Sequence, residues 1–367
     1  MTEWKECKLG DFIELHRGYD LTKNSIIPGN YPVVCSTSIM GYHNEYKVKA
    51  PGVVIGRSGT LGEVQYIDID FWPHNTSLYV SDFKGNNPKF VKYFLQKFGT
   101  GNVGSGSAVP TLNRNHIQSL TITIPPLETQ KKIAKILSSL DDKIENNNKI
   151  NTNLEQQAQA LFKSWFIDFD PFGGKMPAGW KMGKLSEIAE ITMGQSPDGK
   201  SYNEDGIGTV FYQGRAEFGI RFPTRRLFTT EPKRMAKKFD TLMSVRAPVG
   251  DTNIANEDCC IGRGLAAIHS NDNHQSFIHY TVLALRSQLD VFNGEGTVFG
   301  CINRDALNNM EVVIPSKSDL DKFEQIVASL DADIFNRSEE NRNLTNLRDT
   351  LLPKLMSGEI EVDSVQI

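Results

Sequence analysis

Three histidines in the second half of the chain, His269, His274 and His279, recur at intervals of five residues and are the side chains whose type best suits a metal ion. An α-helix repeats every 3.6 residues, so this interval would not gather the three rings on one helix face. We expect them to be surface or core residues. The five cysteines form no C-x-x-C pair, and their odd number predicts neither a zinc site nor a disulfide framework. They are Cys7, Cys35, Cys259, Cys260 and Cys301.

Motifs for catalysis are missing from the sequence. There is no Walker A motif, no dinucleotide-binding glycine fingerprint after a strand, no H-E-x-x-H and no G-x-S-x-G. The glycine-rich segment GSGSAVP at 104–110 is not followed by a helix with a phosphate-binding pattern. The segment DPFG at 170–173 resembles the tetrapeptide with which amino-methyltransferases hold their target base, but it has one proline instead of two. We interpret it as the end of a long helix, because proline cannot continue one. A binding or scaffolding role is favoured.

Two nearly identical hexapeptides, SLDDKI at 139–144 and SLDADI at 329–334, stand 190 positions apart. At the start of each copy, Trp4 and Trp180 begin matching segments that are 176 positions apart. The change in offset predicts an insertion in the second copy, in the loop after Met193. The chain therefore consists of two diverged copies of one unit.

The first part of each copy has short β-branched and aromatic runs, such as GVVIG and SLTITI, punctuated by Gly, Pro, Asn and Asp. Brief helical patterns such as KFVKYFLQKF lie between them. We predict an α+β protein with two mixed α/β domains, each built on a twisted, largely antiparallel sheet. The predicted boundaries are 1–127 and 179–315 for the two domains, 128–166 and 316–358 for two long helices, 167–178 for a linker and 359–367 for a tail.

Each copy ends in a heptad pattern, with seam residues spaced alternately three and four apart. A heptad seam needs a partner, and we predict that the two helices pair as an antiparallel coiled coil; the other reading is that each helix packs only on its own domain. Polar residues at matching seam positions would fix the register. Ser318, followed by Asp321, is predicted to cap the second helix. The central seam residues are Leu140, Ile144, Asn147, Asn151 and Leu154 in the first helix and Leu330, Ile334, Arg337, Asn341 and Leu344 in the second.

Composition limits which ligands and which cellular compartment are expected for the protein. The formal net charge of -4 argues against a simple nucleic-acid binder. No apolar run approaches the ~20 residues that a membrane helix needs, and the first residues lack the pattern of a signal peptide. We therefore expect a cytoplasmic protein that has no contact with a membrane.

The segment LRDTLLPKLMSGEI at 347–360 resembles the C-terminal segment of specificity subunits of type I restriction-modification systems. LFKSWFIDFDPF at 161–172 is similar to the end of their central helix, and SVRAPVGDTNIANEDCCIGRGLAAI at 244–268 to a recurrent part of their target recognition domains. The resemblance extends over essentially the whole chain. It implies a non-catalytic subunit whose two target recognition domains each read one half of a split site in double-stranded DNA.

The same resemblance implies partners. Two modification subunits would dock largely on the long helices and bring S-adenosylmethionine and the chemistry of adenine N6-methylation, so no cofactor is expected in this chain. Restriction subunits would join the complex. Two alternatives stay open: a methyltransferase or nuclease whose motifs are not recognised, or the DNA-reading subunit of a related system in which one polypeptide both modifies and cleaves.

DNA contacts are expected on exposed loops that carry Arg, Asn or Gln, because these side chains match base edges in the major groove. Arg221, Arg225, Arg226, Arg234, Lys237 and Lys238 form a basic run that suits phosphates. The second domain is richer in arginine, so we predict that it contributes more of the direct readout. The predicted DNA-binding residues are Arg57, Ser58, Thr60, Asn75 and Thr76 in the first domain and Gln213, Arg215, Arg225, Arg226, Arg246 and Arg263 in the second.

Overall fold

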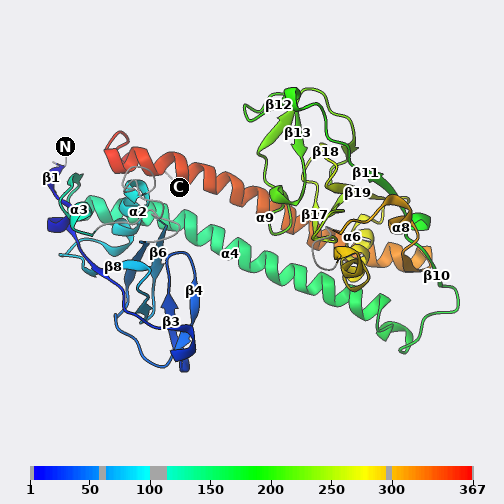
Figure 1. Ribbon diagram of the computed structural model, residues 1–367, viewed down its shortest axis with the longest axis horizontal. Coiled ribbons are helices and arrows are strands. Elements are labelled where there is room, and N and C mark those ends of the chain that lie inside the picture. Colours follow the sequence, from blue (N-terminus) through cyan, green and yellow to red (C-terminus); the bar gives the residue numbers. More distant parts are fainter. Residues whose placement is uncertain (1–3, 58–62, 100–113, 295–299, 366–367) are drawn as a thin grey trace. The chain divides into compact units, whose positions relative to one another are not determined.

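The computed structural model describes residues 4–57, 63–99, 114–294 and 300–365 (Figure 1). Contacts divide the chain into two compact units: unit 1 contains Met1–Asn146 and Glu340–Ile367, and unit 2 contains Asn147–Glu339. Both boundaries fall inside long helices. Each unit therefore contains one globular domain and part of each long helix. The domain boundaries given above remain a sequence-based division, and we call 1–127 domain 1 and 179–315 domain 2.

Domain 1 contains three small sheets, with strand orders β1-β9, β2-β8-β5-β6 and β4-β3-β7. All strand pairs are antiparallel except β3 with β7. Its elements are β1 (Lys5–Lys8), α1 (Leu9–Phe12), β2 (Glu14–Arg17), η1 (Lys23–Ser25), β3 (Pro28–Val34), β4 (Ile39–His43), β5 (Gly52–Gly56), β6 (Val64–Ile67), β7 (Trp72–Pro73), β8 (Ser77–Asp82), α2 (Pro88–Gly99), α3 (Arg114–Gln118) and β9 (Thr121–Ile124).

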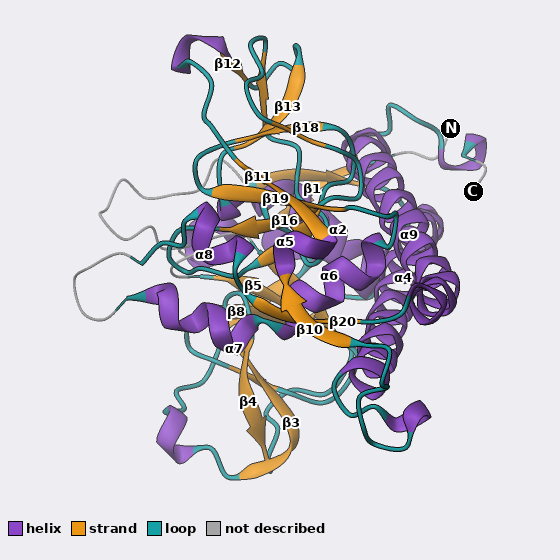
Figure 2. Cartoon of the chain, turned by 90° about the vertical axis from the view of Figure 1, so that its right-hand side faces the viewer, coloured by secondary structure: helices purple, strands orange, loops and turns teal. Residues whose placement is uncertain are grey.

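Domain 2 repeats this plan with strand orders β10-β20, β11-β19-β16-β17 and β12-β14-β13-β18-β15. The sheet of β13 and β18 lies next to the sheet of β11, β19 and β16 (Figure 2). Its elements are β10 (Lys181–Lys184), α5 (Leu185–Ile188), β11 (Ala189–Met193), η3 (Gly199–Ser201), β12 (Tyr202–Asn203), β13 (Thr209–Tyr212), η4 (Arg215–Glu217), β14 (Leu227–Thr229), β15 (Met235–Ala236), β16 (Thr241–Ser244), β17 (Thr252–Ile254), β18 (Cys259–Ile261), β19 (Leu265–Ser270), α6 (Gln275–Ala284), α7 (Arg286–Leu289), η5 (Asp290–Asn293), α8 (Arg304–Asn308) and β20 (Glu311–Ile314).

The repeat seen in the sequence is present strand by strand. The parallel pair β3-β7 of domain 1 corresponds to the parallel pair β13-β18 of domain 2. The predicted place of the insertion, after Met193, is wrong. Gly194 and Tyr212 are 18 positions apart, against 16 for the equivalent Gly18 and Val34, whereas Tyr212 and Gly262 are 50 apart, against 40 for Val34 and His74. Most of the additional residues therefore follow β13. One expectation is modified: each domain has three small sheets in place of one. The strands are only two to seven residues long, too short to build one large sheet.

The long helices are α4 (Leu127–Phe166) and α9 (Lys317–Ser357). In unit 1 the first turns of α4 pack against the last turns of α9, since Ile133, Leu137 and Leu140 share a core with Leu351 and Leu355. In unit 2 the opposite ends meet, where Phe162 and Phe166 share a core with Phe323 and Val327. The predicted antiparallel pairing is confirmed within each unit, and each helix also packs on a domain (Figure 1).

The predicted seam residues are all buried or half-buried. Asn147 is fully buried, and its Oδ1 accepts a hydrogen bond of 3.3 Å from Nη1 of Arg337, the residue that matches it in the second copy. Asn151 donates to the hydroxyl of Ser338 at 3.2 Å. Polar residues of the two seams therefore do meet in the interface.

The predicted cap of the second helix is wrong by two residues. Helix α9 begins at Lys317, and the hydroxyl of Ser316 accepts a hydrogen bond from the backbone N–H of Asp319. Ser316 is the better position because it directly follows Pro315, so the chain can leave β20 and start the helix at once. A short 3₁₀ helix, η2 (Asp170–Phe172), follows the end of α4 at Phe166, and η6 (Val362–Ser364) follows α9.

Candidate nucleic-acid interface

Four predicted residues of domain 2, Gln213, Arg215, Arg246 and Arg263, line one hollow on its surface. They come from three separate segments: the loop after β13, the loop after β16 and the turn between β18 and β19. We call this the arginine hollow. Its lining residues are Ser196, Gln213, Gly214, Arg215, Ser244, Arg246, Ala247, Arg263 and Gly264.

Close backbone packing fixes the turn that carries Arg263. The N–H of Gly262 donates to the carbonyl of Tyr212 at 2.8 Å, and the N–H of Arg263 donates to the hydroxyl of Ser196 at 3.3 Å. A Cβ atom at Gly194 would lie 2.1 Å from the carbonyl oxygen of Gly262, a distance that no side chain tolerates. Glycine is therefore required there for the backbones to approach.

The arginines of the hollow differ in their partners. Arg215 contacts the carboxylate of Asp251 at 2.5 Å, and Arg286 contacts the same carboxylate at 2.7 Å. Arg246 and Arg263 are exposed, and among the residues that the structure describes no carboxylate lies within ion-pair distance of either guanidinium. Their positive charge is available to an outside ligand.

Domain 1 has a matching site. The N–H of His74 donates to the carbonyl of Val34 at 2.8 Å, as Gly262 does to Tyr212, and a Cβ at Gly18 would lie 2.1 Å from the carbonyl oxygen of His74. Asn75 therefore occupies the position of Arg263. Its side-chain amide donates to the carboxylate of Asp20.

Arg57 also belongs to this site, because its backbone N–H donates to the carbonyl of Thr76 at 3.0 Å. Its guanidinium lies 3.5 Å from the carbonyl of Asn75. The hydroxyl of Thr76 lies 3.0 Å from Nδ1 of His74. The remaining candidates in domain 1, Ser58 and Thr60, lie outside the described residues.

Three residues of the basic run of domain 2, Arg221, Arg225 and Arg226, pair with carboxylates, whereas Arg234, Lys237 and Lys238 are exposed. Arg225 pairs with Glu257, and Arg226 contacts the buried carboxylate of Glu217 at 2.6 Å. For Arg221 the proposed phosphate contact is wrong: the side chain is only 9% exposed and pairs with Glu155 of α4 and, at 2.5 Å, with Asp331 of α9. A buried charge needs such partners, and they come from helices distant in sequence.

The aspartate of each SLD hexapeptide holds a domain on the helices, a role that the sequence analysis did not assign. In unit 2 the hydroxyl of Tyr280 donates to Asp331 at 2.9 Å. In unit 1 the hydroxyl of Tyr93 donates to Asp141 at 2.6 Å. The signal was present in the sequence, since Asp141 and Asp331 are equivalent residues of the repeated hexapeptides.

Asp141 is surrounded by positive charge. Lys92 of α2 lies 2.6 Å and Arg348 of α9 2.9 Å from its carboxylate oxygens. Burial alone would raise the pKa of Asp141, but the hydrogen bonds from Lys92, Tyr93 and Arg348 outweigh it and hold the pKa below the usual carboxyl value. The residue is therefore ionised at neutral pH and joins α2, α4 and α9.

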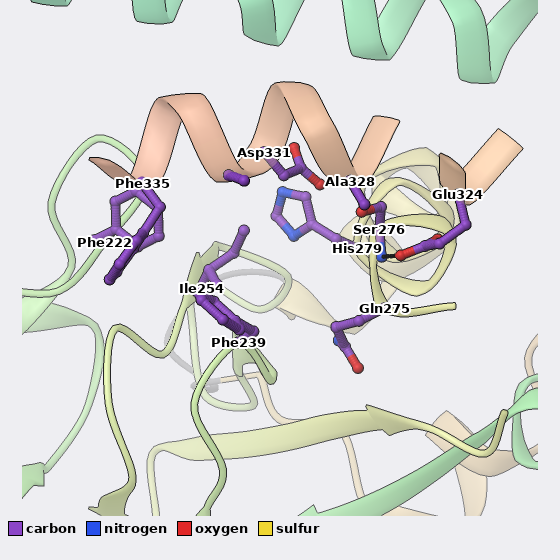
Figure 3. A pocket seen from close by; sticks show the side chains of 11 residues that line it. Phe222, Phe239, Ile254, Gln275, Ser276, His279, Glu324, Ala328, Asp331 and Phe335 are labelled. Carbon is purple, nitrogen blue, oxygen red and sulfur yellow. Dashed lines mark hydrogen bonds between the residues drawn. The ribbon is translucent and has the colours of Figure 1, made fainter. Parts of the chain in front are cut away.

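A second, mostly apolar hollow lies where domain 2 meets α9 (Figure 3). Its walls include Phe222, Phe239 and Phe335, and the ring of His279 points into it. Burial lowers the pKa of His279 well below its ordinary value, with a smaller contribution from nearby Arg221, so the ring is neutral. His274 is instead paired with Asp272 and Asp321. In the described part of the chain, no group of three or more His, Cys, Asp or Glu side chains could hold a metal ion.

The two domains thus present polar side chains on equivalent turns, each held by a close glycine contact. None of the described helices combines the length and the apolar character needed to cross a membrane. The class defined by this arrangement is a two-site binding protein built on a helical scaffold.

Comparisons with known proteins identify the family. The model of the type I restriction modification DNA specificity domain matches residues 1–156 and 177–344. A putative type I restriction enzyme specificity subunit of Methanocaldococcus jannaschii, MjaX, is 33% identical over 294 residues, which cover 75% of this chain and 68% of that protein. The HindI specificity subunit of Haemophilus influenzae is 27% identical over 328 residues, covering 68% of this chain and 71% of that protein. The chain therefore belongs to the type I restriction-modification DNA specificity family.

The fold is shared with a solved structure. The S subunit of a type I restriction-modification system from M. genitalium matches with a TM-score of 0.68 over 96% of both chains, at 18% sequence identity. The family model and the relatives identify the chain as a subunit that supplies DNA sequence specificity.

Proposed function

We propose that this chain reads a split site in double-stranded DNA, with domain 2 binding one half and domain 1 the other. The observation that supports this proposal is the repeated position of the two sites. Arg263 and Asn75 stand on equivalent turns, and each turn is held by the same backbone hydrogen bond and the same glycine contact. Two copies of one reading surface suit two half-sites.

The helix pair would space the two half-sites and carry the partner subunits. A helix of 40 residues, such as α4, is roughly 60 Å long at ~1.5 Å per residue. We propose that two modification subunits dock mainly on these helices and supply S-adenosylmethionine for N6-methylation of adenine, and that restriction subunits complete the complex. This chain would contribute no reacting group, and its location would be the cytoplasm, where the DNA is.

The test is modification-site sequencing of DNA from cells that express this chain with its modification subunit, compared with cells that express the modification subunit alone. We expect a split motif with N6-methyladenine in each half that disappears when this chain is omitted. Unchanged methylation despite a stable complex would contradict the proposal. Binding of S-adenosylmethionine by the isolated chain would instead support the methyltransferase alternative.

A further inference from the structure

We propose that Arg263 reads a guanine in the half-site bound by domain 2, with Arg246 beside it in the arginine hollow. This inference rests on the proposed function, and it names the base that one residue recognises. Four observations carry it: the free charge of the guanidinium, the rigidity of its turn, the chemistry of the hollow and the contrast with domain 1.

Arg263 differs from neighbouring arginines because its guanidinium is not paired with a carboxylate of the described residues. Arg215, Arg225 and Arg226 each face a carboxylate, from Asp251, Glu257 and Glu217 respectively. Arg263 is exposed, and the described residues offer it no carboxylate within ion-pair distance. An arginine that is already paired must give up its partner before it binds DNA, whereas Arg263 is ready to donate.

The turn that carries Arg263 is held from both sides by glycines. A Cβ atom at Gly262 would lie 2.7 Å, and one at Gly264 3.0 Å, from the carbonyl oxygen of Gln213. The opposing Gly194 is equally confined by Gly262. Such packing fixes the backbone position of Arg263. Base recognition requires this fixed placement, while a phosphate contact tolerates a mobile charge.

The hydrogen-bonding pattern of the hollow suits guanine. In the major groove guanine presents two acceptors, N7 and O6, and a guanidinium can donate to both at once. Adenine and cytosine each present an amino donor, which would oppose a second arginine hydrogen bond, and thymine presents a single acceptor. The amide of Gln213 lines the same hollow and can also donate to a base edge.

Domain 1 provides the internal contrast, because Asn75 occupies the position of Arg263. An asparagine side chain pairs one donor nitrogen with one acceptor oxygen, a pattern that matches adenine N7 and N6 and not the two acceptors of guanine. The two half-sites would therefore differ at the base pair that faces this turn.

The experiment uses the full-length chain with its modification subunit and compares four proteins by modification-site sequencing: wild type, R263A, R263K and R304A. We expect one position of one half-site to be guanine with the wild type and to lose its base preference with R263A. Discrimination against the other bases should fall by about 5- to 150-fold, the range for one good bidentate contact. R263K keeps the charge but not the planar fork, so the preference for guanine should weaken without being abolished.

R304A is the matched control, since Arg304 is an exposed arginine of domain 2 at the start of α8, outside the arginine hollow and the basic run. It should leave the base preference at every position unchanged. Two results would overturn the inference while leaving the proposed function intact: a split motif that keeps its guanine in R263A, or a changed position that was not guanine in the wild type. If cells with the wild-type chain showed no methylation beyond that of cells with the modification subunit alone, the proposed function itself would be refuted.

Discussion

The carboxylate of Asp141 accepts hydrogen bonds from a lysine, a tyrosine and an arginine that belong to two different helices. Its equivalent, Asp331, binds Tyr280 and Arg221 in the same way. The similarity of the two hexapeptides thus has a physical cause. Each aspartate lies half-buried at the place where a domain joins the helices and accepts hydrogen bonds from that domain.

Replacing Asp141 by asparagine should destabilise the protein in a pH-dependent way. At pH 7 we expect the free energy of unfolding to fall by about 2 kcal/mol, because hydrogen bonds to a charged group are lost. The folded-state pKa of Asp141 lies below its unfolded value of 3.8, so its contribution is present above about pH 4 and disappears as the pH falls through the folded-state pKa. Urea unfolding of wild type and D141N at pH 7 and about pH 3 measures this.

The adjacent Asp142 provides the control, since its side chain is 68% exposed and its nearest ion-pair partner, Lys89, is 4.0 Å away. D142N should change the free energy of unfolding by less than about 0.5 kcal/mol. An equal loss for D141N at both pH values would mean that Asp141 acts by shape and not by charge.

For single residues, the sequence analysis predicted which side chains line the arginine hollow, but not which arginines are paired with carboxylates. Gln213, Arg215, Arg246 and Arg263 are predicted from residue type and from their place in expected loops, and the fold brings all four together. The prediction that Arg221 contacts phosphate is wrong because its partners, Glu155 and Asp331, lie far away along the chain. No local pattern distinguishes a solvated arginine from one that a distant helix will bury.

Among the elements, the long helices were the most predictable, because their heptad pattern extends over 40 residues. The division of each domain into three small sheets was not predictable. It depends on the pairing of β1 with β9 and of β10 with β20, which joins the two ends of each domain. Short strands carry too little pattern to identify partners more than 100 residues away.

The polar contact between Asn147 and Arg337 should cost stability while it fixes the pairing of the helices. N147A removes a fully buried acceptor and is expected to lower the free energy of unfolding by about 1–3 kcal/mol. The double variant N147L/R337L should recover most of this loss, because apolar residues of similar size often replace a buried polar pair without penalty. Urea denaturation of the full chain measures both effects.

The exposed Asn153 on the same helix is the control, and N153A should have an effect below about 0.5 kcal/mol. If N147L/R337L were as unstable as N147A, the site would require polarity for folding and not only for register. That outcome would contradict the interpretation of this contact as a register device.

For the whole molecule, the proposed spacer role predicts how the DNA gap responds to helix length. Seven residues inserted after Asn146 and seven after Glu339 preserve the heptad register and lengthen both helices by about 10 Å. Since base pairs rise about 3.4 Å each, the gap between half-sites should grow by roughly three base pairs. Modification-site sequencing reads this gap directly.

Insertion into α4 alone is the informative contrast. It leaves the two seams unequal in length, so we expect the split motif to be lost. A gap that stays the same after the matched insertion would show that the helix pair does not set the spacing.

Unit 1 is assembled from two segments separated by all of unit 2. Leu351, Leu355 and Met356, near the end of the chain, complete a core that begins with Leu9 and Phe12. At about 5–20 residues per second, roughly 10–40 seconds of synthesis separate Asn146 from Glu340. Unit 2 is contiguous and can close first. On the ribosome, the domain that emerges first is therefore the last to be finished, and the apolar face of α4 must be shielded, by a chaperone or by transient collapse, until the final helix arrives.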